Sequence, residues 1–173
     1  MKKLVLILLL FVSVFSFSNE DFTESEKNAV LKQFVEFQKA IKNKDVNALK
    51  KFIDGSVYGL VLNDGPAYRL NTDSVDYNEI VRYKDEFFKS VKEVTLVKVN
   101  LKNNEVTKYT KGEDTITGDF FIQAEDNYIW GSKGEKMFEI AAVYDDPEYP
   151  SGAEYIFKMK GNQLKFVCIY SMP

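Results

Sequence analysis

The sequence predicts an α+β domain in which N-terminal helices pack on a mostly antiparallel sheet. Apolar residues between positions 23 and 90 recur at the spacing of amphipathic helices. Residues 94 to 170 instead form short runs that are rich in β-branched and aromatic side chains. Helices followed by a meandering sheet are typical of this fold class, because the helices cover the apolar face of the sheet.

The first 18 residues have the pattern of a secretory signal peptide. Lys2 and Lys3 precede an apolar run from Leu4 that extends to Phe17. The run is shorter than the roughly 20 residues that a membrane-spanning helix needs, and Ser16 and Ser18 are small residues at a cleavage site. We expect cleavage after Ser18 and a single mature domain of residues 19–173 that is exported to the periplasm or the exterior; an uncleaved membrane anchor is the alternative.

The mature chain is mildly acidic. The whole chain has a formal charge of −3, which becomes −5 when Lys2 and Lys3 are removed with the signal. Its lysines alternate with acidic residues, so no basic face is expected and nucleic-acid binding is not predicted. Cys168 is the only cysteine, so the fold depends on its hydrophobic core and not on an internal disulfide.

Two capping boxes predict the starts of two helices. Thr23 with Glu26 begins the first helix, and Asp76 with Glu79 begins another that we expect to end near Ser90. Between them, Asp45 is expected to cap a short second helix that Gly55 ends. Residues 56–70 have the pattern of extended chain around an Asn-Asp-Gly-Pro turn.

The second half of the chain predicts six strands separated by hairpin-like turns. Asn103-Asn104 and Gly161-Asn162 are pairs that tolerate the positive φ angles of two-residue hairpin loops. Cys168 is expected to be a small buried side chain. The expected strands are residues 94–101, 106–110, 115–124, 137–144, 153–160 and 164–170.

Two segments resemble the NTF2-like superfamily. Residues 34–53 are similar to its opening pair of helices with an Asp-containing turn, and residues 155–166 to its closing hairpin. The resemblance implies a curved sheet wrapped around the helices as a cone whose mouth holds a small ligand, and it also implies dimerisation as an alternative role. Its isomerase-like members use a first-helix tyrosine, but Phe37 occupies that position, and the nearest carboxylate, Asp64, adjoins a turn.

The chain has no histidine, which excludes His-dependent nucleophiles and the common His-based zinc sites. Carboxylate, tyrosine and lysine chemistry remain. The acidic segment Asp145, Asp146, Glu148 and Glu154 is the nearest approach to a calcium loop, but it matches no calcium-binding spacing and is interpreted as a solvated connection. No metal site and no cofactor are predicted.

Aromatic residues in the strands and loops are the candidate ligand-binding residues, either as the lining of an apolar pocket or as ordinary packing. Trp130 beside Gly131 is the least routine of these positions. The residues are Tyr58, Tyr68, Tyr109, Tyr128 and Trp130. We therefore expect an exported, non-catalytic module that binds a small apolar ligand or a protein, with a cofactor-free carboxylate–tyrosine enzyme and a homodimerising structural module as alternatives.

Overall fold

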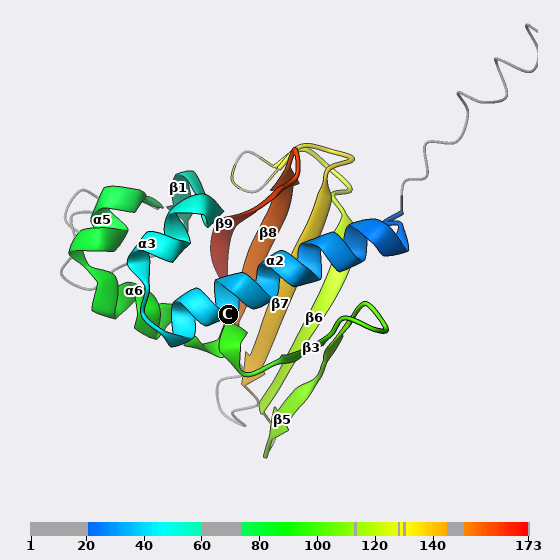
Figure 1. The fold of residues 1–173 in the computed structure, drawn as a ribbon, viewed down its shortest axis with the longest axis horizontal. Helices are drawn as coiled ribbons and strands as arrows, with labels where there is room; N and C mark the ends of the chain where they lie inside the picture. The colour runs from blue at the N-terminus through cyan, green and yellow to red at the C-terminus, as the bar shows by residue number, and fades with distance from the viewer. Residues whose placement is uncertain are drawn as a thin grey trace, which may run out of the picture.

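The structure is a computed structural model that describes residues 21–59, 74–112, 114–127, 129, 131–144 and 151–172. It has the predicted α+β architecture, in which the 19-residue helix α2 (Glu24–Lys42) lies across a seven-stranded sheet (Figure 1). No helix in the described part of the chain is long and apolar enough to cross a membrane.

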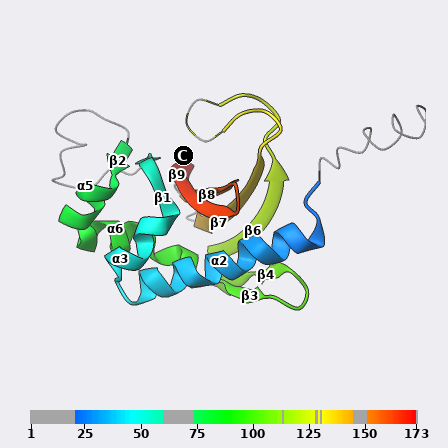
Figure 2. The same cartoon turned by 45° about the horizontal axis from the view of Figure 1, so that its top comes forward.

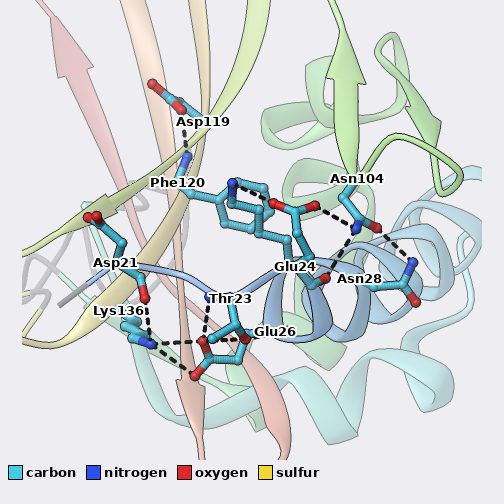
Figure 3. A network of polar contacts seen from close by, with 10 residues as sticks. Asp21, Thr23, Glu24, Glu26, Asn28, Asn104, Asp119, Phe120 and Lys136 are labelled. Carbon is cyan, nitrogen blue, oxygen red and sulfur yellow. Dashed lines mark hydrogen bonds and ion pairs between the residues drawn. The ribbon is translucent and has the colours of Figure 1, made fainter. Parts of the chain in front are cut away.

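Helix α2 begins at the predicted capping box. The Thr23 hydroxyl accepts a hydrogen bond from the Glu26 amide at 3.2 Å, and the Glu26 carboxylate accepts one from the Thr23 amide at 2.8 Å. Lys136 of strand β7 (Lys136–Tyr144) donates to both Glu26 oxygens and to the carbonyl of Asp21, as Figure 3 shows. These hydrogen bonds lower the pKa of Glu26 to about 2 and tie the first turn of α2 to the sheet.

The opposite flank of α2 is tied to a small hairpin. Asn28 donates to the Asn104 side chain at 2.7 Å, and Asn104 donates to the carbonyl of Glu24 at 3.1 Å (Figure 3). That hairpin joins strands β3 (Lys98–Asn100) and β4 (Glu105–Thr107). Its turn spans residues 101–104, so the predicted two-residue Asn103-Asn104 loop is wrong, although Asn104 does have a positive φ angle.

A second helical segment follows α2 after the predicted turn. Asp45 accepts a hydrogen bond from the Ala48 amide at 3.0 Å and caps the short helix α3, as predicted. The prediction that Gly55 ends this helix is wrong, because Gly55 lies inside strand β1 (Ile53–Tyr58). Its φ angle is +77°, and the register of β1 against β9 is irregular there.

The second capping box is also confirmed, with the Glu79 amide 2.9 Å from the Asp76 carboxylate. The helix that it begins is broken at Tyr83, whose φ and ψ of −116° and 42° are not helical. In the described residues, the helical elements after α2 are the α-helices α3 (Val46–Leu49), α5 (Tyr77–Arg82) and α6 (Lys84–Ser90) and the 3₁₀ helices η1 (Lys50–Phe52) and η2 (Lys92–Thr95).

The strands form a seven-stranded sheet in the order β2-β1-β9-β8-β7-β6-β5 and a separate two-stranded sheet, β3-β4. All neighbours are antiparallel except β1 and β9, and the Gly161-Asn162 hairpin joins β8 to β9 as predicted. The strands are β1 (Ile53–Tyr58), β2 (Ser74–Asp76), β3 (Lys98–Asn100), β4 (Glu105–Thr107), β5 (Tyr109–Lys111), β6 (Asp114–Ile122), β7 (Lys136–Tyr144), β8 (Ser151–Lys160) and β9 (Gln163–Met172).

Two strand predictions need correction. Val94 and Thr95 belong to η2 and not to a strand, and the expected strand 106–110 divides at Lys108 into β4 and β5 of different sheets. Gly118 of β6 explains how β4 packs across the large sheet, since a Cβ there would lie 2.9 Å from Val106 of β4. Glycine is therefore needed at position 118, because the packing of β4 against β6 leaves no room for a side chain.

The main core lies between α2 and the sheet and is dominated by phenylalanine. Phe37 of α2 packs edge-on against Phe52 and Phe157 at ring-centroid distances of 5.3 and 5.1 Å. The rings that fill this space with exposed fractions of 1% or less are Phe34, Phe37, Phe52, Phe87, Phe138, Phe157 and Phe166. The helix side of the sheet is therefore closed by the chain's own side chains.

A smaller cluster lies on the other face of the sheet. Met137, Ile156, Val167 and Cys168 are buried there, under Ile129 of the β6–β7 connection. Cys168 is a buried thiol, as expected, and a bulge in β9 places it on the face opposite Phe166. In Figure 2 the sheet is curved, with α2 on one side and the β6–β7 connection on the other.

Candidate functional site

The structure does not bring the described candidate residues together. Tyr58 of β1 packs on the small cluster, on the face of the sheet away from α2. Tyr109 lies on β5, at the other end of the sheet, and packs on the main core. Tyr68, Tyr128 and Trp130 lie outside the described residues, so a ligand-binding role for them stays a prediction.

Two hollows that share lining residues lie beside Tyr144, the last residue of β7. The larger has a volume of about 420 Å³ and lies over Tyr109, Leu96 and Ile116. The smaller has a volume of about 290 Å³ and lies over Ser90 and Tyr155. Three residues line both hollows, and we call the combined feature the Glu93 hollow after the central one; the shared residues are Lys92, Glu93 and Tyr144.

Glu93 is a buried carboxylate, with only 9% of the residue exposed. The hydroxyl of Tyr155 lies 2.8 Å from its Oε2 atom and 3.2 Å from the carbonyl oxygen of Ser90. The Tyr144 hydroxyl forms a second hydrogen bond with Glu93, and the Lys92 ammonium lies 3.6 Å from its Oε1 atom. A buried carboxylate is tolerated when it accepts such hydrogen bonds.

The two tyrosines are held in their protonated form. Burial, and then the negative charge of Glu93, raise the pKa of Tyr144 to about 12, and the same two causes raise the pKa of Tyr155 further above its usual range. Both phenols are therefore donors at neutral pH. The carboxylate has more acceptor positions than these two donors use, so it can accept a further hydrogen bond from a ligand.

Helix α2 fixes the backbone of the segment η2, which carries Glu93. Gln38 is only 6% exposed, and its Nε2 atom donates to the carbonyls of Val94 at 2.6 Å and Val97 at 3.0 Å. Val91 and Val94 on either side of Glu93 are fully buried in the main core. η2 is thus anchored by packing and hydrogen bonds, which holds the carboxylate at the wall of the hollow.

Sequence reasoning selected only Tyr109 among the residues of this site. Glu93 lay at the boundary between an expected helix and an expected strand, and Tyr144 and Tyr155 were interpreted as strand residues. Glu93 and Tyr155 are 62 positions apart in the chain. No local motif connects residues so distant.

A second group of carboxylates lies on the other face of the sheet. Glu139 of β7 is paired across the strands with Asp119 of β6, and Glu154 of β8 lies close by, opposite Ala141. Burial, and then the charges of Glu154 and Asp119, raise the pKa of Glu139 to about 6. In the described part of the chain, no group of three or more cysteine and acidic side chains is arranged to hold a metal ion. Asp145, Asp146 and Glu148 fall outside that part.

Comparison of the chain with protein-family models, with curated proteins and with solved structures finds no match.

Proposed function

We propose that this protein is an exported binding module that holds a small organic molecule in the Glu93 hollow without transforming it. One observation carries the proposal: a buried carboxylate, fixed by two tyrosine hydroxyls, forms the wall shared by two adjoining hollows. A volume of about 420 Å³ is within the range of pockets that hold small ligands, roughly 300–1,000 Å³.

The proposed site does not lie between α2 and the sheet, where a cone-shaped fold would hold its ligand, because the core fills that space. A ligand between α2 and the sheet would have to displace phenylalanine side chains that are packed against one another. The Glu93 hollow is instead open to a ligand and needs no such rearrangement. Its rigid support by Gln38 also means that little ordering is required on binding.

Two broader parts of the proposal have independent support. An NTF2-like relationship is supported by the capped turn at Asp45, the short helix after it and the closing hairpin at Gly161-Asn162. Export is supported by the pattern of residues 1–18, a basic start followed by an apolar run and small residues at Ser16 and Ser18.

Native mass spectrometry of the processed protein from its own host tests the binding proposal. We expect a native mass that exceeds the denatured mass by a few hundred daltons in the unaltered chain. The excess should decrease strongly in Glu93→Gln and Tyr144→Phe, and it should persist in Tyr58→Phe, which removes a hydroxyl at the other end of the sheet. An excess that all three variants retain would place the ligand elsewhere.

A homodimer without bound ligand would argue against the proposal and for the alternative role in protein interaction. The same spectra distinguish these cases, because a dimer doubles the mass whereas a ligand adds a small increment. Circular dichroism of each variant would show whether a lost ligand simply reflects a lost fold.

A second candidate function is proton-transfer catalysis without a cofactor. It is favoured by the 2.8 Å contact between the Glu93 carboxylate and the Tyr155 hydroxyl, which is the pairing that a carboxylate–tyrosine enzyme requires. The released ligand decides between the functions. Conversion of added ligand by the unaltered protein and not by Glu93→Gln would establish catalysis, whereas recovery of unchanged ligand supports binding alone.

A further inference from the structure

We propose that the ligand of the Glu93 hollow is a small organic cation, an amine attached to an aromatic or short apolar body. This inference rests on the proposed binding function and names the chemical class of its ligand. It follows from the difference between the charge inside the hollow and the charges around its rim.

Glu93 is the most buried of the charged side chains that line the hollow. Its side chain is 12% exposed, whereas that of Lys92 is 67% exposed. Lys89, Lys111 and Glu86 at the rim are exposed as well, and Asp114, a second carboxylate that lines the larger hollow, is half-buried. Exposed charges are screened by water and salt, while a buried carboxylate is screened far less, so Glu93 determines which ligand charge is favoured.

The hydrogen bonds of the site leave the carboxylate ready for a donor. Tyr144 and Tyr155 stabilise its negative charge without neutralising it, since both remain protonated phenols. Lys92 forms an ion pair with Glu93, but its ammonium lies 3.6 Å from Oε1, which is too distant for a hydrogen bond, and its side chain is exposed. A ligand ammonium has three N–H donors and can reach the acceptor positions that the phenols do not use.

The rest of the larger hollow suits an apolar or aromatic body. Leu96 is 42% exposed and Ile116 contributes a buried apolar wall. Tyr109 and Tyr144 add aromatic rings, whose faces attract cations as well as apolar groups. Binding would cover Leu96, which is one of the few large apolar side chains exposed in the described residues.

Three probes of matched shape test the inference: benzylamine, benzyl alcohol and benzoate, titrated into the protein and followed by amide chemical shifts in NMR. We expect benzylamine to bind about tenfold more tightly than benzyl alcohol, equivalent to about 1.4 kcal/mol, and benzoate to bind most weakly. The shifts should centre on Thr95, Leu96 and Tyr109. In Glu93→Gln the preference for the amine should disappear, and in Glu105→Gln, an exposed position on β4, it should remain.

Equal affinities for the three probes, or a preference for benzoate, would overturn the cation class and leave the binding function standing. A Glu93→Gln variant that keeps its spectrum, binds benzyl alcohol normally and still prefers benzylamine would also overturn it. If no probe shifts the NMR signals of the hollow, but native mass spectra show a ligand that is lost in Glu93→Gln, the proposed cation class is wrong and the binding function holds. If neither effect is seen, both proposals fail.

Discussion

Glu139 illustrates how a single carboxylate can respond to pH because of its neighbours. It is half-buried on β7, it faces Asp119 across the strand pair, and Glu154 approaches from β8. Burial and like charges both disfavour its ionised form, so its pKa in the folded protein is about 6, above the value of about 4.3 expected in the unfolded chain. Between these two values the folded state binds more protons than the unfolded state.

This difference in bound protons predicts a loss of stability as the pH rises from about 4.3 to about 6. Replacing Glu139 by glutamine removes the ionised form, so Glu139→Gln should be more stable than the unaltered chain at pH 7.5 by about 1 to 2 kcal/mol. The gain should vanish at pH 4. Denaturant unfolding at the two pH values measures it, and Glu105→Gln on β4 serves as the exposed control. If Glu139→Gln stabilised the protein equally at both pH values, the ionisation of Glu139 would not be the cause.

Residue chemistry was only partly visible in the sequence. The absence of histidine narrowed the available chemistry to carboxylates, tyrosines and lysines, and the site that we describe is made of those groups. Among the residues that line the site, however, the sequence pattern indicates only Tyr109 as a candidate. The capacity of Glu93 to act depends on its burial and on partners from β7 and β8, and neither property is encoded in neighbouring positions of the chain.

At the scale of elements, Gln38 connects α2 to η2. Its buried side-chain amide donates hydrogen bonds to the backbone carbonyls of Val94 and Val97. We predict that Gln38→Ala lowers the free energy of unfolding by about 1 to 3 kcal/mol, because it leaves the carbonyls of Val94 and Val97 unpaired. It should also broaden the NMR signals of η2.

Thermal unfolding and amide hydrogen exchange of residues 92–95 measure these effects. Lys39→Ala, on the exposed side of the same helix, is the matched control and should change stability by less than about 0.5 kcal/mol. Unchanged exchange in η2 after Gln38→Ala would show that the core alone positions Glu93.

Gly118 tests the contact between the two sheets. A Cβ at this position would lie 2.9 Å from atoms of Val106 and Ile140, closer than packed atoms normally approach. We predict that Gly118→Ala costs about 1 to 3 kcal/mol, because β4 must move away from β6. Denaturant unfolding compares it with Thr117→Ala, a neighbouring substitution on the other face of β6. A neutral Gly118→Ala would mean that the β3–β4 hairpin is free to shift.

Local elements were predictable where the signal was local. Both capping boxes, the Asp45 cap and the Gly161-Asn162 hairpin are formed by residues within a few positions of one another, and all were correctly predicted. Gly55 was misinterpreted as a helix end, because a positive φ angle serves equally in an irregular strand. The division of residues 106–110 into β4 and β5 depends on which sheet each half joins, which is a tertiary choice.

For the whole molecule, the division of the chain into a signal peptide and a mature domain gives a testable prediction. We expect the mature protein isolated from its host to begin at Asn19, because Ser16 and Ser18 are the small residues of the cleavage site. Intact mass measurement and N-terminal sequencing of the exported fraction test this. Recovery of the protein with residues 1–18 attached would support the alternative of a retained anchor.

The fold class, the starts of the main helices and the chemistry available to a site could all be predicted from the amino-acid sequence. These properties follow from hydrophobic periodicity, capping residues and composition, which are local or additive. Two features could not be predicted in this way: phenylalanine fills the space beside α2, and Glu93, Tyr144 and Tyr155 meet at the margin of the sheet. The reason is physical: burial and hydrogen bonding between residues 62 positions apart arise only when strands and helices have been placed in space.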